Sequence, residues 1–151
     1  MSYVMGCVLP VQGSRRERFV EQARKVAPFF QEFGASSVVD AVEDDVPKGA
    51  VTDFHRSVAA REGELIAFGW VVWPDKAAKD AGEAKMMADP RMDMSDMAFD
   101  SQRMIFSGFE PVVDEGPGGA FGYVDGFVIA VPTVNRDVFI QHCRTAAPLF
   151  L

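Results

Sequence analysis

Two segments of the chain are apolar on both faces and predict interior strands of a sheet. From Tyr3 to Val11, apolar residues occupy both sides of an alternating pattern, and many of them are β-branched or aromatic. Residues 65–73 are almost continuously apolar, interrupted only by Gly69. Because a solvated face would carry polar side chains, both segments are predicted to be covered on two sides.

A helix is predicted after the first strand. Its apolar residues recur at i, i+4, i+7 and i+11, which places one stripe along the helix: Phe19, Ala23, Val26 and Phe30. Ser14 and Glu17 have the spacing of a capping box at its start, and Gly34 is a suitable stop at its end. Pro28, late in this helix, is expected to kink or tighten the last turns.

A second helix is predicted between Asp75 and Asp89. Asp75 is the expected N-cap, and the pair Asp89-Pro90 ends the helical pattern. Alanines form a narrow stripe that would let this helix pack closely on a sheet: Ala77, Ala81, Ala84 and Ala88.

Shorter segments complete the expected order of elements. Residues 36–43 and 103–113 predict two more strands, 44–49 predict a turn, and 51–58 are interpreted as a further strand. With 51–58 left aside, the order β-α-β-β-α-β predicts an α+β fold of ferredoxin-like type, with both helices on one face of an antiparallel sheet. The second, apolar face needs a cover, and we expect the same face of a second subunit to supply it in a homodimer.

The beginning of the chain recurs near its end. Residues 3–30 align with residues 123–150 without a gap, at a period of 123 − 3 = 120 residues. Such self-similarity indicates an internal duplication. It divides the chain into a ferredoxin-like domain (1–115), a linker (116–122) and a partial second copy (123–151). The identical pairs are Tyr3/Tyr123, Val4/Val124, Gly6/Gly126, Val8/Val128, Val11/Val131, Arg16/Arg136, Phe19/Phe139, Ala27/Ala147, Pro28/Pro148 and Phe30/Phe150.

The partial copy, a predicted strand at 123–131 followed by a helix, is too small to bury its own apolar faces. We therefore expect it to dock, and three arrangements remain open. The strand adds to an edge of its own sheet, it crosses to a partner chain, or the chain is the front part of a longer tandem protein. If the copy docks within the dimer, deletion of residues 116–151 should lower the melting temperature.

The composition argues against nucleic-acid and membrane partners. There are 22 acidic against 15 basic residues, the net charge is −7, and Arg15-Arg16 is the longest basic run, so a phosphate-neutralising surface is missing. The apolar runs fall well short of the roughly 20 residues that span a bilayer. The first residues lack the basic region and cleavage site of a signal peptide. Cys7 and Cys143 occupy non-equivalent positions of the two copies, which favours two reduced thiols in a cytoplasmic protein.

Several short blocks between residues 45 and 110 have a distinctive sequence. They include DVPKG at 45–49, VTDF at 51–54, KMMADPRM at 85–92 and the stretch from Phe99 to Glu110. These blocks resemble the YbaA-like family of uncharacterised bacterial proteins, and the resemblance covers residues 3–115. It implies a ferredoxin-like fold that forms a dimeric α/β barrel, and it brings no established activity. The family's first-strand pattern, YVDGFVIAVP, is matched better by residues 123–132 than by the first strand.

His55 is the single histidine of the first 115 residues and could act as an acid or base near neutral pH. On a strand, Asp53 would share a face with His55 and could orient it. A plain surface histidine is the alternative. We take His55, Asp53 and Arg91 as catalytic candidates. The ligand-binding candidates are polar or aromatic residues beside apolar ones in the family-like blocks: Trp70, Lys85, Asp89 and Arg103. Each charged candidate could equally form an ion pair that fixes a loop, such as Asp89 with Arg91 or Asp100 with Arg103.

Two other patterns suggest a metal or a cofactor, and for both we favour a simpler interpretation. Methionines lie among aspartates from Met86 to Asp100, and thioethers could hold Cu(I), but such methionines more often fill a core. The glycines between 116 and 122 lack the spacing of a phosphate-binding loop, because Phe121 occupies the last glycine position. We therefore expect neither a metal nor a cofactor.

Two classes of function remain open. Histidine stands at no suggestive spacing from a serine or cysteine, so an unaided hydrolase is not favoured. The first class is a protein that binds or transforms a small organic molecule, in a site between sheet and helices. The second is a non-catalytic interaction or assembly module. An enclosed pocket containing His55 or Arg91 with a strongly shifted pKa would favour the first class, and a filled interior with an exposed apolar patch would favour the second.

Overall fold

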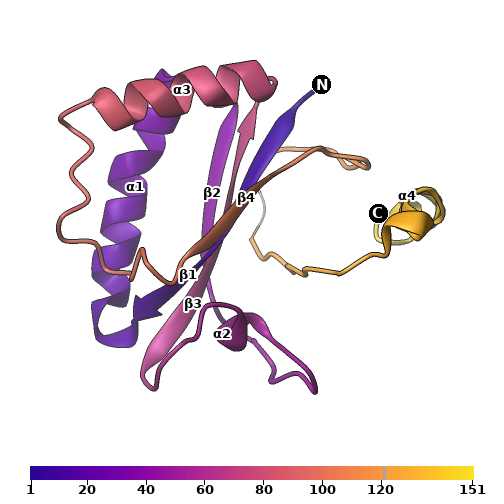
Figure 1. The fold of residues 1–151 in the computed structure, drawn as a ribbon, viewed down its shortest axis with the longest axis horizontal. Coiled ribbons are helices and arrows are strands. Elements are labelled where there is room, and N and C mark those ends of the chain that lie inside the picture. Colours follow the sequence, from indigo (N-terminus) through magenta and orange to yellow (C-terminus); the bar gives the residue numbers. More distant parts are fainter. Residues whose placement is uncertain (121) are drawn as a thin grey trace. The chain divides into compact units, whose positions relative to one another are not determined.

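A four-stranded antiparallel sheet and helices form an α+β structure in the computed structural model, which describes residues 1–120 and 122–151 (Figure 1). The chain divides into two compact units, Met1–Glu110 and Pro111–Leu151. The predicted linker 116–122 belongs to the second unit, and its residue 121 lies outside the described residues.

The sheet has the strand order β2-β3-β1-β4. Its strands are β1 (Tyr3–Gln12), β2 (Ser37–Val42), β3 (Glu64–Trp73) and β4 (Ile105–Phe109). Every neighbouring pair is antiparallel. The two segments with apolar residues on both faces, β1 and β3, are the inner strands, so that prediction is confirmed.

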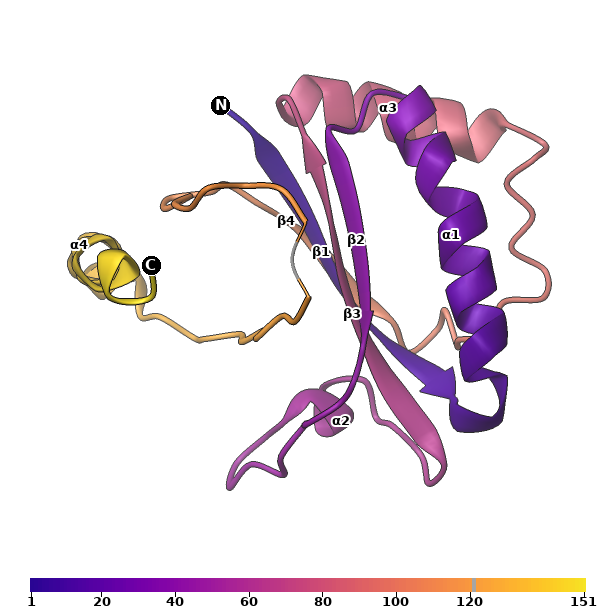
Figure 2. The same cartoon turned by 180° about the vertical axis from the view of Figure 1, so that it is seen from behind.

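Both long helices cover the same face of this sheet (Figures 1 and 2). Helix α1 (Arg16–Glu32) follows β1, and α3 (Lys76–Ala88) follows β3. A single helical turn, α2 (Phe54–Ser57), separates β2 from β3. Apart from α2, the first unit therefore has the predicted order β-α-β-β-α-β.

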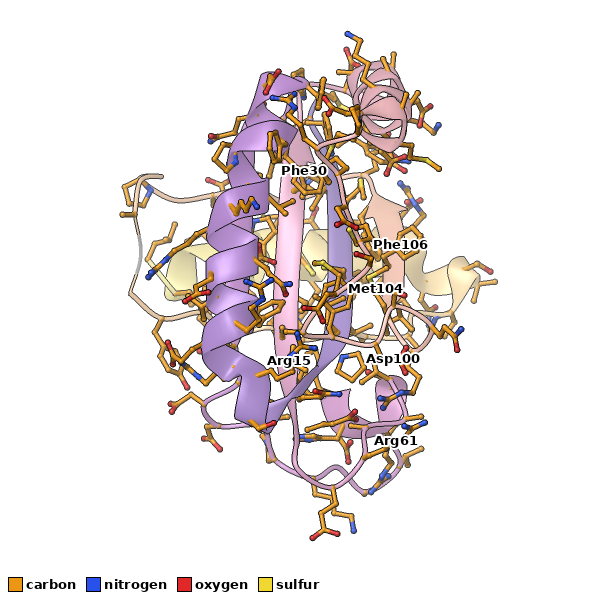
Figure 3. All side chains as sticks on the ribbon, turned by 90° about the vertical axis from the view of Figure 1, so that its left-hand side faces the viewer. Arg15, Phe30, Arg61, Asp100, Met104 and Phe106 are labelled. Atoms are coloured by element: carbon orange, nitrogen blue, oxygen red, sulfur yellow. The ribbon has the colours of Figure 1, made fainter. Side chains whose placement is uncertain are left out.

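Two apolar clusters fill the layer between sheet and helices. The first centres on Leu9, Val11, Phe19, Ala67 and Ala98, with Phe19 contributed by α1. The second centres on Ala35, Val71 and the fully buried Trp73, and Phe30 of α1 packs against it. Phe19 and Phe30 belong to the predicted apolar stripe, and Figure 3 shows Phe30 on α1 in a view of the helix-covered side.

Three of the four predicted helix ends are confirmed, including the end of α3 before Asp89-Pro90. The Asp75 carboxylate accepts a hydrogen bond of 2.7 Å from the Ala78 N–H and caps α3 as predicted. Gly34, with φ of +111°, ends α1 as predicted, since a left-handed backbone is easiest for glycine. The predicted capping box is wrong. Ser14 lies in a 3₁₀ turn, Gly13–Arg15, and no side chain caps α1.

The predicted alanine stripe of α3 is also wrong, because these alanines are exposed. The helix packs through Gly82 and Met86, which are its buried residues. A methyl group on Gly82 would lie 2.6 Å from Cη2 of Trp73, so the absent side chain lets the helix approach the indole ring. The large Trp73 side chain, and not the alanine stripe, therefore determines which face of α3 packs against the sheet.

The strand predicted at 51–58 is replaced by α2. The Asp53 carboxylate accepts a hydrogen bond of 2.8 Å from the Arg56 N–H, which caps this turn. The strand predicted at 103–113 is shorter, since β4 covers only residues 105–109. β4 pairs with β1 from Val8 back to Val4, and this pairing limits its length.

The second face of the sheet carries apolar side chains from all four strands. Within the first unit, the segment around α2 covers one end of it, where Val58 packs on Val8 and Ile66. Cross-strand partners show which further residues share this face. The large apolar ones are Val4, Val39, Trp70, Val72, Ile105 and Phe109, of which Ile105 is 44% and Phe109 54% exposed. Ser37 and Ser107 also lie on this face.

The second unit contains a 3₁₀ turn (η2, Thr133–Asn135), helix α4 (Arg136–Ala146) and a second 3₁₀ turn (η3, Ala147–Leu149). The starts of η2 and α4 lie 120 residues after those of the first 3₁₀ turn and α1, as the repeat predicts. Residues 123–131, predicted as a strand, form no strand in the described part of the chain. A strand needs hydrogen-bonding neighbours, and β1, which these residues resemble, has two.

Candidate functional site

His55 lies on α2, beside the second face of the sheet. Its Nε2 lies 2.9 Å from Oε2 of Glu43, which follows β2 directly. The same carboxylate oxygen accepts a hydrogen bond of 2.7 Å from the Ile66 N–H. Glu43 is therefore fixed by β3 and in turn holds the imidazole, an arrangement that suits a proton donor or acceptor.

Asp53 does not orient His55, contrary to the prediction. Besides capping α2, its carboxylate accepts a hydrogen bond from the Gly49 N–H at 3.2 Å and pairs with Arg56 at 3.2 Å. These contacts, with the Arg56 N–H foremost, lower the pKa of Asp53. The prediction failed because it assumed a strand, in which residues two apart share a face. In a helical turn, Asp53 is the cap instead.

An aromatic row links the α2 corner to Trp70. The rings of Phe54 and Phe68 lie 5.8 Å apart, and the rings of Phe68 and Trp70 also lie 5.8 Å apart. The structure thus brings His55 and Trp70 to one face of the sheet, although they were singled out for different reasons.

Arg91 and Asp89 lie on the other side of the molecule, beside α1. The Arg91 guanidinium is 2.7 Å from Asp89 and 3.0 Å from Glu32, and it stacks 4.6 Å from the ring centre of Phe29. Hydrogen bonds from Arg91 lower the pKa of Asp89, and the two carboxylates raise the pKa of Arg91. Arg91 also lines a hollow of about 270 Å³ between α1 and residues 91–97.

Arg103 forms a clamp between β3 and the segment before β4. It contacts the Glu64 carboxylate at 2.6 and 2.7 Å and that of Asp100 at 2.8 Å, and it donates to the Ala59 carbonyl at 3.0 Å. The Arg103 and Glu64 side chains are only 15% and 10% exposed. Hydrogen bonding to Arg103 is the main cause that lowers the pKa of Glu64 to about 2. Asp100 and Arg61 lie at this end of the sheet in Figure 3.

The predicted site residues therefore do not form one site. His55 and Trp70 share the second sheet face, Asp89 and Arg91 lie beside α1, and Arg103 belongs to the clamp. Lys85 is exposed on α3. The sequence interpretation missed Glu43, because a partner twelve residues away across a turn has no characteristic spacing.

A second group of residues that the sequence interpretation missed lies in the middle of the helix-covered face. The Asp40 carboxylate lies over Gly69, where an added methyl group would come within 2.6 Å of its Oδ1. Cys7 is the partner of Gly69 on β1. Partial desolvation raises the pKa of Asp40, which is still exposed on the edge strand β2. Desolvation, with the Asp40 charge second, raises the pKa of the half-buried Cys7 to about 11. A thiol with this pKa is protonated at neutral pH and is a poor nucleophile.

Within residues 1–120 and 122–151, no three or more His, Cys, Asp or Glu side chains gather in a way that could hold a metal ion. None of the helices in this described part of the chain combines the length and the apolar composition of a membrane-spanning segment.

These features define an α+β protein with a four-stranded antiparallel sheet, an acid-histidine pair at one corner and a separate hollow beside α1. The chain belongs to the family described as "Protein of unknown function (DUF1428)", which matches residues 2–101. It is 45% identical over 117 residues to "Uncharacterized protein YbaA" of Escherichia coli (strain K12), and this alignment covers 76% of the chain and 100% of the relative. The protein of the same name from Shigella flexneri gives the same values. The YbaA-like resemblance is thereby confirmed.

Two solved structures are more distantly similar. Rv0793 from Mycobacterium tuberculosis has a TM-score of 0.41 and 15% identity, with 76% of this chain and 98% of that chain covered. The de novo designed protein Foldit4 has a TM-score of 0.39 and 13% identity, with 74% and 99% covered. Similarity at this level carries no argument about function.

Proposed function

We propose that the protein is a self-associating module of ferredoxin-like type, in which the second sheet face binds the same face of another copy to form a dimeric α/β barrel. The observation that carries this proposal is the apolar second face, to which every strand of the sheet contributes. Within the first unit only the α2 segment covers it, at one end.

The chemistry of this face favours a second copy over a charged partner. Apart from Ser37 and Ser107, the side chains that share it are apolar, chiefly valines, isoleucines and aromatics, and such a surface is matched best by another apolar one. In a twofold dimer each residue acts twice, so a mainly apolar face complements itself. The His55 and Glu43 pair would lie at the rim of the interface.

A matched pair of substitutions on β4 tests the dimer. Phe109 is 54% exposed on the second face, whereas Phe106 is 61% exposed on the helix-covered face of the same strand. Burial of one phenylalanine contributes about 1.5–3 kcal/mol, and two copies contribute about twice that, so Phe109→Lys should weaken dimerisation by ~100-fold or more. Phe106→Lys should leave the dissociation constant within a few-fold of the parent. A monomeric parent in sedimentation equilibrium, or equal effects of the two variants, would contradict the proposal.

A small-molecule role is the second candidate, and the hollow beside α1 favours it. It contains Arg91, and its volume of about 270 Å³ lies just below the usual range of ligand pockets. The predicted location between sheet and helices receives less support, because two apolar clusters occupy that layer. Should the molecule also transform a ligand, His55 remains the catalytic candidate, since Asp53 and Arg91 are engaged in structural contacts.

A further inference from the structure

Hydrogen bonds and ion pairs fix the two walls of the hollow, which are helix α1 and the loop of residues 91–97. At one end, the Gln22 side chain donates to the Asp96 carbonyl at 2.6 Å and accepts from the Ala98 N–H at 2.9 Å. At the other end, Arg91 joins the loop to Glu32 and Phe29 of α1. A loop fixed to a helix at both ends leaves a preformed space between them, as ligand sites commonly do.

The inner surface of the hollow is rich in thioethers. Met92, Met94 and Met97 line it from the loop, and Val26 and Phe29 line it from α1. The sequence interpretation placed these methionines in the core, yet Met94 is 52% exposed. Flexible, polarisable methionine side chains adapt well to apolar groups and make favourable contacts with aromatic rings.

Two opposite charges face this space from different walls. Lys25 of α1 and Asp93 of the loop both line the hollow, and among the described residues neither forms an ion pair within 4.0 Å. Asp93 accepts a hydrogen bond of 2.9 Å from the Ser95 N–H of its own loop. Hydrogen bonds from the Ser95 side chain and backbone are the main causes that lower the pKa of Asp93, and the charge of Lys25 across the hollow adds to them.

The other charged groups of the lining already have partners. Arg18 lies 3.9 Å from Glu21 and 4.0 Å from Asp96, and Asp96 also pairs with Arg15 at 2.9 Å. Arg91 is held by carboxylates outside the lining. One cation and one anion therefore remain available to a ligand, on opposite walls of a thioether-lined space.

We propose that this hollow binds a small zwitterion with an apolar side group, of the amino-acid class, with its carboxylate at Lys25, its ammonium group at Asp93 and its side group against Met92, Met94 and Met97. This assignment rests on the small-molecule role proposed above and adds the class of ligand. A ligand with a single net charge would match only one of the two walls.

Methionine methyl groups offer a direct readout. The full chain contains 8 methionines, so [methyl-13C]methionine labelling gives few signals, which single Met→Leu variants assign. L-phenylalanine should shift the signals of Met92, Met94 and Met97 and leave that of the core residue Met86 in place. The same titration is run with L-phenylalaninamide, which lacks the carboxylate, and with N-acetyl-L-phenylalanine, which lacks the ammonium group.

Two charge-removing variants test the carboxylate contact and the ammonium contact of the ligand separately. Lys25→Gln should weaken L-phenylalanine binding about tenfold and leave L-phenylalaninamide unaffected, as expected for the loss of one charge-assisted hydrogen bond. Asp93→Asn should weaken L-phenylalanine similarly and leave N-acetyl-L-phenylalanine unaffected. Lys48→Gln, an exposed lysine outside the hollow, is the matched control and should change nothing.

Two results would overturn the assignment in different ways. Equal shifts with all three compounds, unchanged in both variants, would still support a small-molecule site but would contradict a zwitterionic ligand. If none of the compounds shifted the three methionine signals, both the proposed site and the small-molecule role would be contradicted.

Discussion

Replacement of Gly82 by alanine should destabilise the protein, although alanine is the better helix former. Gly82 is buried on α3 against Trp73. A methyl group there would lie 2.6 Å from Cη2 of the indole and 2.7 Å from the Phe33 carbonyl oxygen. Carbon atoms do not approach so closely, so the helix or the indole must move.

The two opposing effects differ in size. Alanine in place of glycine within a helix stabilises by about 1 kcal/mol. Overpacking a filled core costs about 1–3 kcal/mol. We take the upper end of this cost because Trp73 is 0% exposed and cannot easily move. The second close contact, at Phe33, is with a backbone oxygen, which cannot rotate away as a side chain can. The net expectation is a destabilisation of about 2 kcal/mol, or a fall in melting temperature of roughly 4–8 °C.

Thermal and urea unfolding followed by circular dichroism measure this difference. Ala81→Gly, at the exposed neighbouring position, is the control for helix propensity and should cost about 1 kcal/mol without any steric effect. Trp73→Phe removes the ring atoms nearest Gly82, so Gly82→Ala should be less harmful in that background by about 1–2 kcal/mol. A Gly82→Ala protein that melts above the parent, or an equal effect of Gly82→Ala in both backgrounds, would refute the steric explanation.

Three further outcomes are expected. Glu64→Gln should destabilise by about 1–3 kcal/mol, since it breaks the contact with Arg103. Because the folded pKa of Glu64, about 2, lies below the ordinary glutamate value of 4.5, its stabilising contribution is present above pH 4.5 and is lost as the pH falls toward 2. As the pH is lowered through that range, the urea midpoint of Glu64→Gln should fall less steeply than that of the parent. Parallel plots of midpoint against pH for the two proteins would contradict this. Asp75→Ala should cost about 1 kcal/mol through loss of the α3 cap, whereas Asp75→Ser should retain most of it in the same unfolding assay. Cys7, with a pKa of about 11, should react with iodoacetamide at pH 8 far more slowly than free cysteine, as followed by mass spectrometry, and a rate equal to that of free cysteine would argue against its burial.

The sequence by itself determined the features that depend on neighbouring residues. Apolar residues on both faces identified β1 and β3 as inner strands, because the side chains of a strand alternate between two faces whatever surrounds them. Asp75 and Gly34 marked helix ends because a cap and a left-handed residue act within one turn. Family membership also followed from short blocks of sequence.

Only the tertiary structure decided which distant groups meet. Glu43 rather than Asp53 holds His55, and Glu64 binds Arg103, across separations that no local pattern encodes. The pairing of Asp100 with Arg103, three residues apart, was expected from the sequence. The buried face of α3 was set by the bulk of Trp73, which overrode the alanine periodicity. Residues 123–131 repeat the sequence of β1 without forming a strand. A helix forms its backbone hydrogen bonds within itself, whereas a strand depends on neighbours elsewhere in the chain, so a helix forms at Arg136–Ala146 although no strand forms at 123–131.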